Sequence, residues 1–153
     1  MTSTELKRLR ERLREHEGER LVVYDDATGK PLKPGMTLIG YPTIGVGRNL
    51  VGRGITEVES GMLLENDLMS VTRDVQHALP WMATLAPARQ SVLVEMAFQM
   101  GLRGLLGFKQ TLTAVREGRY EDAARGMLTS KWARQTPARA KRLAQIMETG
   151  EWL

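Results

Sequence analysis

The chain has 153 residues, of which 42% are hydrophobic, so it is long enough to bury a core in one compact unit or in two small lobes. It has no cysteine and only two histidines, which excludes disulfides and the usual His/Cys zinc sites. Its formal net charge of +4 favours an acidic partner, which nucleic acid, anionic lipid or an acidic wall polymer would each satisfy.

The first predicted helix covers residues 3–17. Thr2 and Glu5 have the spacing of a capping box, and Gly18 ends the pattern. Leucines recur at helical intervals along the segment: Leu6, Leu9 and Leu13. The segment is charged throughout and has no apolar run typical of a signal peptide or a membrane span, so we expect a protein made in the cytoplasm.

Two β-like segments follow, residues 20–24 and residues 41–46, with turn residues at 30–35 between them. We expect a small antiparallel hairpin or a three-stranded sheet. Strand alternation in the second segment would place three residues on one face: Thr43, Gly45 and Gly47. Such a bare face suits the close approach of a sugar chain. A dinucleotide site is excluded, because the third glycine of that fingerprint is missing.

The remaining chain has helical patterns. A second capping box, from Thr56 to Glu59, opens a long amphipathic helix at about 56–79 that could join two lobes. The segment from 87 to 100 is apolar on most faces, which predicts a buried helix. Thr136 and Pro137 have the chemistry of a helix start. Several glycines are expected to interrupt the helices: Gly101, Gly104, Gly107, Gly118 and Gly126.

Glu17 is a carboxylate in an unusual position. It lies four residues beyond Leu13, at the edge of the apolar face of the first helix, so we expect its side chain to be partly buried. Burial and the negative end of the helix dipole both favour a protonated carboxyl group, which makes Glu17 a candidate proton donor. The alternative is a frayed helix end with the side chain in water.

A second carboxylate follows after a short segment, because the chain can turn back at Gly18 and bring Asp25 or Asp26 opposite Glu17. Glycoside hydrolysis uses such a pair: one acid protonates the leaving oxygen while an ionised carboxylate activates water or attacks the sugar. The alternative is that the aspartates only begin a turn with Thr28 and Gly29. Both interpretations can hold together.

These residues resemble the signature of the phage-type lysozymes of glycoside hydrolase family 24. The matching elements are Glu17-Gly18, Asp26 nine residues after Glu17, and Thr-Ile-Gly-Val-Gly at residues 43–47. Residues 97–101 and 130–142 also resemble family segments, so the likeness covers nearly the whole chain. It implies cleavage of the β-1,4 link between N-acetylmuramic acid and N-acetylglucosamine in peptidoglycan.

The resemblance also implies roles for single residues. Glu17 would be the general acid, Asp26 the base and Thr43 the residue that holds the attacking water, in an inverting reaction. Four further residues match positions that bind substrate: Gly45, Phe98, Gln99 and Arg139. Phe98 is at least as consistent with a core position, and Arg139 with an exposed cation at a helix start.

The fold implied is α+β, mostly helical and lysozyme-like, with one lysozyme domain over residues 1–153. A small β-containing lobe would cover about 15–60, the linking helix about 56–79 and the helical lobe about 80–153, with helix 3–17 packing on the helical lobe. We expect no metal, no cofactor and no nucleic-acid partner, and we expect a monomer. The resemblance also implies that the protein stays in the host cytoplasm before lysis and needs a holin to reach the wall in the periplasm.

The sequence departs from the family pattern at two places. Residues 27–41 form an insertion between Asp26 and Thr43. Arg48 stands where the family often has a histidine that pairs with an aspartate of the linking helix, which predicts a pair between Arg48 and Asp67.

Two other classes of function remain open at this point. One is a catalytically silent domain that binds the wall or serves as a tail component. The other is nucleic-acid binding by a cluster of basic residues, although a solvated helix face explains the cluster equally well. Its members are Lys131, Arg134, Arg139, Lys141 and Arg142.

Overall fold

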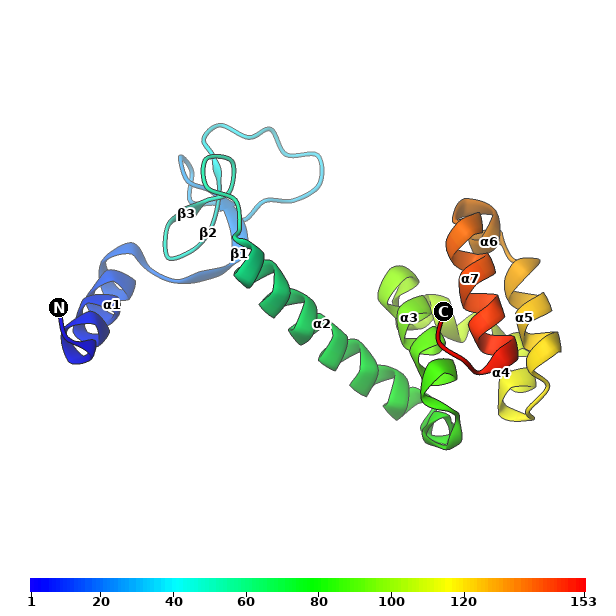
Figure 1. The fold of residues 1–153 in the computed structure, drawn as a ribbon. Helices are drawn as coiled ribbons and strands as arrows, with labels where there is room; N and C mark the ends of the chain where they lie inside the picture. The colour runs from blue at the N-terminus through cyan, green and yellow to red at the C-terminus, as the bar shows by residue number, and fades with distance from the viewer. The chain divides into compact units, whose positions relative to one another are not determined.

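A computed structural model describes residues 1–153, and its contacts divide the chain into two units, Met1–Ser60 and Gly61–Leu153. Helices predominate, and a three-stranded antiparallel sheet lies in the first unit (Figure 1). The predicted α+β, mostly helical class is therefore confirmed. None of the helices combines the length and the apolar character that crossing a membrane requires.

Unit 1 begins with helix α1, Ser3–Glu17, which has the bounds that the sequence predicted. The predicted capping box is present, because the Thr2 side chain accepts a hydrogen bond from the Glu5 backbone and the Glu5 carboxylate accepts one from the Thr2 backbone at 2.6 Å. The helix ends at Gly18, whose φ of 71° is left-handed backbone that favours glycine.

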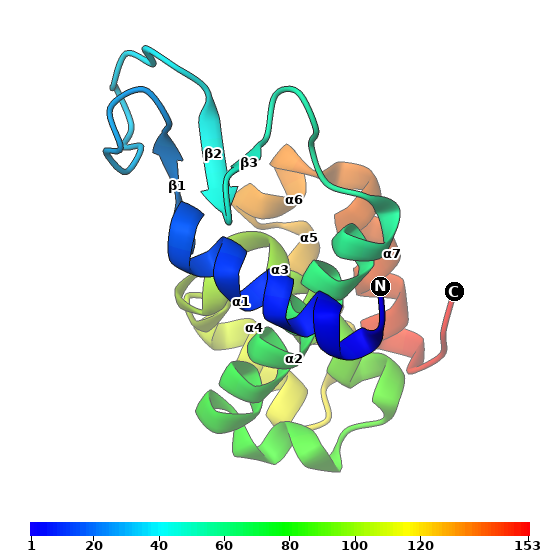
Figure 2. The ribbon, with the colours of Figure 1, turned by 90° about the vertical axis from the view of Figure 1, so that its left-hand side faces the viewer.

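The sheet has three antiparallel strands in the order β1-β2-β3: Arg20–Asp25, Pro42–Gly45 and Arg48–Asn49. Tyr24 pairs with Thr43 and Asp25 pairs with Pro42 across β1 and β2. The insertion at residues 27–41 forms the long loop that connects these two strands in Figure 2. The end of β1 and the start of β2 therefore lie side by side at the base of the insertion.

The predicted glycine face of the second strand is only partly correct. Strand β2 ends at Gly45 because Gly45 has a φ of 66° and Gly47 a φ of 67°, which a regular strand cannot contain. The two glycines form the tight turn into β3, so strand alternation does not extend to Gly47.

Helix α2 covers Glu57–Ala78 and confirms the long helix that the sequence predicted at about 56–79 (Figure 1). Its capping box is also confirmed, since Thr56 Oγ1 accepts from the Glu59 backbone at 3.2 Å and Glu59 Oε2 accepts from the Thr56 backbone at 2.8 Å. The boundary between the two units falls within this helix.

Unit 2 is helical. After α2 it contains a 3₁₀ helix, η1 Pro80–Thr84, and five α-helices: α3 Pro87–Leu106, α4 Lys109–Arg116, α5 Tyr120–Leu128, α6 Lys131–Gln135 and α7 Pro137–Thr149. Helix α7 packs against α3, α5 and α6, and α4 packs against α5. The largest fully buried side chains are mainly Met and Leu: Met82, Leu93, Met96, Leu105, Met127, Leu143 and Met147.

The predicted interruptions are confirmed at Gly101, where α3 contains a residue with φ 76° and ψ 159°, and at Gly118, where φ is 75° between α4 and α5. The prediction for Gly126 is wrong, because this residue lies inside α5. A Cβ there would stand 2.6 Å from Thr111 Oγ1 of α4, so the close packing of the two helices requires a residue without a side chain.

The start of α7 is confirmed in position but not in its capping bond. Pro137 occupies the first turn as expected. The Thr136 hydroxyl donates to the Trp132 carbonyl at 3.1 Å and makes no bond to a backbone N–H of the new helix. Thr136 therefore closes the end of α6.

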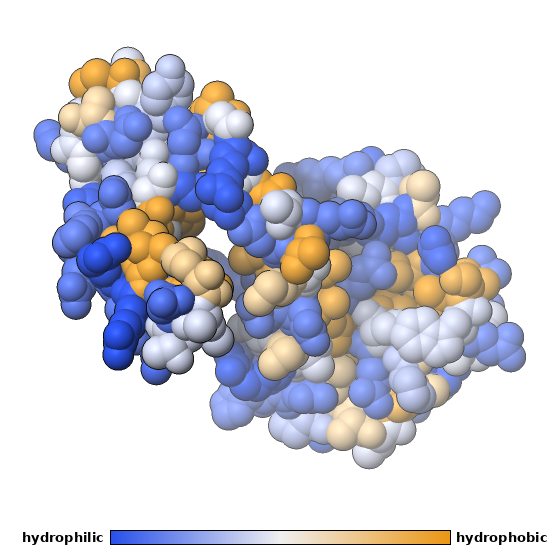
Figure 3. Space-filling view, turned by 60° about the vertical axis from the view of Figure 1, so that its left-hand side comes forward, coloured by the Kyte–Doolittle hydropathy of each residue, from blue (hydrophilic) through white to orange (hydrophobic).

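Large hydrophobic side chains remain exposed on both units, as the orange areas in Figure 3 illustrate. Helix α1 contributes no buried residue, and α2 contributes only Val75. The packing of α1 on the helical lobe stays a prediction.

Arg89 of α3 closes the C-terminal end of α7. Its Nε donates to the Met147 carbonyl at 2.8 Å and one terminal nitrogen donates to the Glu148 carbonyl at 2.9 Å. The guanidinium carbon also lies 3.5 Å from the centre of the Tyr120 ring. Carbonyls in the last turn of a helix lack partners within the helix, so this fork satisfies two of them.

We expect Arg89→Ala to lower the free energy of unfolding by about 1–3 kcal/mol, because charge-assisted bonds to carbonyls and a cation–π contact are both lost. Arg89→Lys should recover only part of the loss, since an ammonium group lacks the planar fork. Urea unfolding measures both, with the exposed Arg116→Ala as control. Equal stability of Arg89→Ala and Arg116→Ala would contradict this role.

Candidate active site

Glu17 is the last residue of α1, and its side chain lies beside the turn between β2 and β3. A Cβ built on Gly47 would be 3.6 Å from Glu17 Oε2. The expected partial burial of Glu17 is not found, because its side chain is exposed and α1 has no buried residue. The Glu17 carboxylate nevertheless lies beside Gly47, the last residue of the sequence signature Thr-Ile-Gly-Val-Gly.

Asp26 directly follows β1 and is exposed. Its Oδ1 accepts a hydrogen bond from the Tyr41 backbone at 2.7 Å, and its own backbone N–H donates to the Tyr41 carbonyl at 3.1 Å. No protein group donates to Oδ2. One oxygen of the carboxylate is thus held by the backbone, and the other is free to bind a ligand or a water molecule.

Asp25 is only 2% exposed. Its oxygens accept three backbone N–H groups, those of Ala27 at 2.9 Å, Ile39 at 2.7 Å and Gly40 at 3.0 Å. These bonds, that of Ile39 foremost, hold the pKa of Asp25 below its ordinary value of 3.8, although burial opposes the shift. Asp25 is a buried carboxylate that binds backbone, whereas Asp26 is accessible, so the two aspartates lie in different environments.

Thr43 is 3% exposed in the middle of β2. Its hydroxyl donates to the Tyr41 carbonyl at 3.1 Å. Because a carbonyl can only accept, the hydroxyl hydrogen is committed to Tyr41, and the two lone pairs of the Thr43 oxygen can accept a hydrogen from another molecule. The backbone of Tyr41 therefore contacts both side chains, Asp26 through its N–H and Thr43 through its carbonyl.

The other predicted site residues belong to unit 2. Phe98 of α3 is 42% exposed, so it is not a core residue. Gln99 Oε1 accepts from Trp132 Nε1 at 2.9 Å. Arg139 lies in the first turn of α7 and is exposed. Its Nε is 3.7 Å from Glu95 Oε1, so the two side chains form a solvent-exposed ion pair.

Sequence reasoning missed several of these contacts. The ion pair of Glu95 with Arg139 was not predicted, although a single acidic residue in an apolar helix is a recognisable signal. The N–H groups that hold the two aspartates come from backbone, at Ile39, Gly40 and Tyr41, and leave no side-chain pattern to recognise.

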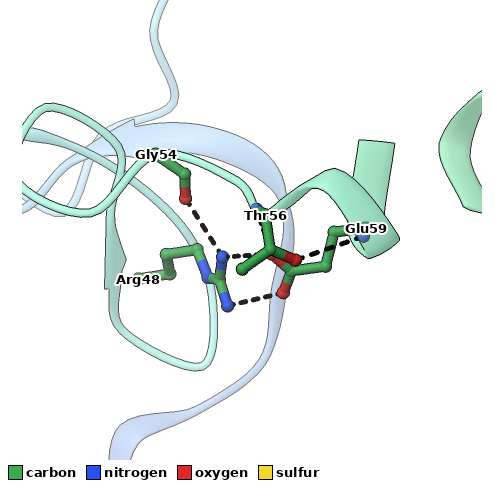
Figure 4. A network of polar contacts seen from close by, with 4 residues as sticks. All are labelled: Arg48, Gly54, Thr56 and Glu59. Carbon is green, nitrogen blue, oxygen red and sulfur yellow. Dashed lines mark hydrogen bonds and ion pairs between the residues drawn. The ribbon is translucent and has the colours of Figure 1, made fainter. Parts of the chain in front are cut away.

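Within unit 1, Arg48 pairs with Glu59 through two contacts of 2.7 and 2.6 Å, and it also donates to the Gly54 carbonyl at 3.0 Å (Figure 4). The sequence did not predict this partner, and the pair with Asp67, a residue of unit 2, stays a prediction. The reason for the pair with Glu59 is local, because Glu59 stands in the first turn of α2, where the capping box already aims its carboxylate toward the end of the sheet.

This network shifts the ionisation of Glu59. The N–H of Thr56, followed by the Arg48 guanidinium, lowers the pKa of Glu59 from 4.5 to about 2. The carboxylate that joins β3 to α2 therefore stays charged down to strongly acidic pH.

Comparison with known proteins gives the class. A family model described as phage lysozyme matches residues 14–146. Probable T4-type lysozyme 1 of Dictyostelium discoideum is 30% identical over an alignment of 172 positions. The alignment covers 93% of this chain and 94% of that protein. The pre-baseplate central spike protein Gp5 of Enterobacteria phage T4 is 36% identical over an alignment of 157 positions. The alignment covers 92% of this chain and 27% of the spike protein.

The chain therefore belongs to the phage lysozyme family. It is a glycoside hydrolase, a muramidase-like enzyme that acts on peptidoglycan.

We expect Arg48 and Glu59 to stabilise the fold cooperatively at neutral pH. The pKa of Glu59 is lower in the folded chain, so its contribution is complete above about 4.5 and is lost as the pH falls toward about 2. A double-mutant cycle of Arg48→Ala and Glu59→Ala, followed by thermal melting at pH 7 and in acid, measures the coupling. Glu57→Ala is the control in the same helical turn. A cycle that is additive at pH 7 would show that the pair contributes nothing.

Proposed function

We propose that this enzyme cleaves the β-1,4 bond between N-acetylmuramic acid and N-acetylglucosamine, with Glu17 as general acid and with water activated by Asp26 and Thr43. The observation that carries the proposal is that the backbone of Tyr41 contacts both side chains. Its N–H donates to the Asp26 carboxylate, and its carbonyl accepts from the Thr43 hydroxyl. Glu17, whose side chain is exposed, supplies the second carboxylate that the reaction needs.

Glu17 donates its proton to the glycosidic oxygen as the bond to the sugar breaks, so that the sugar hydroxyl leaves neutral. Its position beside Gly47 supports this role, because a glycine leaves the space next to the carboxylate clear of side chain.

A water molecule then attacks the anomeric carbon from the opposite face of the sugar. One hydrogen of this water binds Oδ2 of Asp26, which no protein group occupies, and the other binds a lone pair of Thr43 Oγ1. The water oxygen forms the new bond to carbon, and the water proton moves to Asp26. The product is inverted at that carbon.

Substrate contacts are proposed at the residues that match the family motifs. Gly45 lies at the end of β2, in the turn that leads to Gly47, and Phe98 is 42% exposed and offers an aromatic ring to the apolar side of a sugar. Gln99 and Arg139 offer an amide and a cation to a polar, acidic glycan. The net charge of +4 supports an acidic polymer as substrate.

The cellular role proposed is that of an endolysin: a monomer held in the host cytoplasm until a holin admits it to the wall. The similarity to the phage T4 spike protein favours a second candidate, a wall-cleaving part of a virion. Detection of the chain in purified virions would support the second candidate, and its absence from particles with presence in the lysate would support the first.

The proposal predicts that Glu17→Gln loses ~10² to 10⁴-fold or more in peptidoglycan cleavage, the range expected for removal of a general acid. Turbidity of purified peptidoglycan measures the loss, and the exposed Glu15→Gln of the same helix should retain full activity. Circular dichroism should show that Glu17→Gln melts no lower than the parent. Near-parental cleavage by folded Glu17→Gln would exclude Glu17 as the acid, whereas an inactive parent would favour a catalytically silent domain.

A further inference from the structure

The insertion at residues 27–41 folds back onto the end of β1. The Leu32 backbone donates to the Val23 carbonyl at 2.9 Å, and the Asp25 backbone donates to the Lys30 carbonyl at 3.0 Å. These two bonds hold the first half of the insertion against the strand that leads to Asp26. The loop is therefore attached to the sheet and is not a free extension of the β1–β2 connection.

The second half of the insertion is held by the Asp25 side chain. Its two carboxylate oxygens receive the N–H groups of Ile39 at 2.7 Å and Gly40 at 3.0 Å, and one of them also receives that of Ala27 at 2.9 Å. The next N–H along the chain is that of Tyr41, which reaches Asp26 Oδ1 at 2.7 Å. Asp25 thus fixes the backbone segment whose last residue binds Asp26.

Gly40 has no room for a side chain at this point. A Cβ on Gly40 would overlap Asp26 Oδ1 and would come within 2.8 Å of the Ala27 backbone nitrogen. Its φ is outside the left-handed region, so the reason for glycine here is the close approach of the Asp26 carboxylate and not the backbone conformation.

We infer that Asp25 is a positioning residue, which acts through the Ile39–Tyr41 backbone to orient the Asp26 carboxylate and the Thr43 hydroxyl toward the attacking water. The insertion then holds the Asp26 carboxylate, the proposed base, in one orientation. The inference rests on the proposed function and extends it, because it assigns a role to a residue that touches neither substrate nor water.

A fixed orientation of the Asp26 carboxylate matters for the rate of the proposed reaction. An exposed aspartate rotates freely about its side-chain bonds, whereas the single N–H of Tyr41 holds one oxygen and leaves the other directed outward. Small displacements of a catalytic group can cost about 100-fold in rate. Loss of the Asp25 anchor should therefore reduce kcat by about 10- to 100-fold and leave apparent KM within about twofold.

The test uses two variants of the full chain, Asp25→Asn and Gly40→Ala. The asparagine turns an amide NH₂ toward at least one of the backbone donors, and the alanine displaces the Asp26 carboxylate directly. Asp74→Asn and Gly61→Ala are the matched controls, since Asp74 is exposed and a Cβ on Gly61 meets nothing within 4 Å. Rates of reducing-end release are referred to the folded fraction measured by circular dichroism.

A second comparison repeats Asp25→Asn in the Asp26→Asn background. If Asp25 acts through Asp26, it has little further effect there, and the two losses are strongly non-additive. Undiminished kcat in both test variants, or an equal loss in both backgrounds, would overturn the inference while parental activity and its dependence on Glu17 remain. Failure of the proposed function is a separate result, in which the parent itself releases no reducing ends.

Discussion

The hydrogen bonds of two adjacent aspartates to the backbone of the insertion are the interaction on which the geometry of unit 1 depends. Asp25 binds three N–H groups and is almost completely buried, while Asp26 binds one and stays accessible. Neighbouring residues at a strand end point to opposite sides. This alternation leaves the Asp25 carboxylate buried against backbone N–H groups and the Asp26 carboxylate accessible.

A second carboxylate network holds the other end of the sheet. Glu59 caps α2, binds Thr56 and forms a two-pronged pair with Arg48 of β3. The small sheet is thus fixed to the start of α2 by a helix cap that also serves as an ion pair.

Local signals in the sequence predicted the helices well. The two capping boxes placed the starts of α1 and α2, and Gly101 and Gly118 marked real interruptions. Gly126 did not, because contact with Thr111 of another helix decides its role, and no local pattern reports such a contact. Glu59 was missed as the partner of Arg48 for a different, local reason, because the capping box of α2 already holds the Glu59 carboxylate beside the end of the sheet. The spacing of Glu17, Asp26 and Thr43 could be recognised in the sequence. The hydrogen bonds to Asp25 and Asp26 could not, since their donors are backbone N–H groups of an insertion.

In the proposed mechanism the central step is attack by a water molecule that Asp26 and Thr43 hold, and this step predicts which product forms. A lytic cleavage that uses the sugar's own hydroxyl would end each fragment in an anhydro-muramic acid, which is lighter by one water than a reducing end. Mass spectrometry of the glycan fragments released from purified peptidoglycan separates the two. Fragments that end in reducing N-acetylmuramic acid and take up ¹⁸O from labelled water are the result expected, and anhydro ends as the main product would contradict the assignment of Asp26 and Thr43.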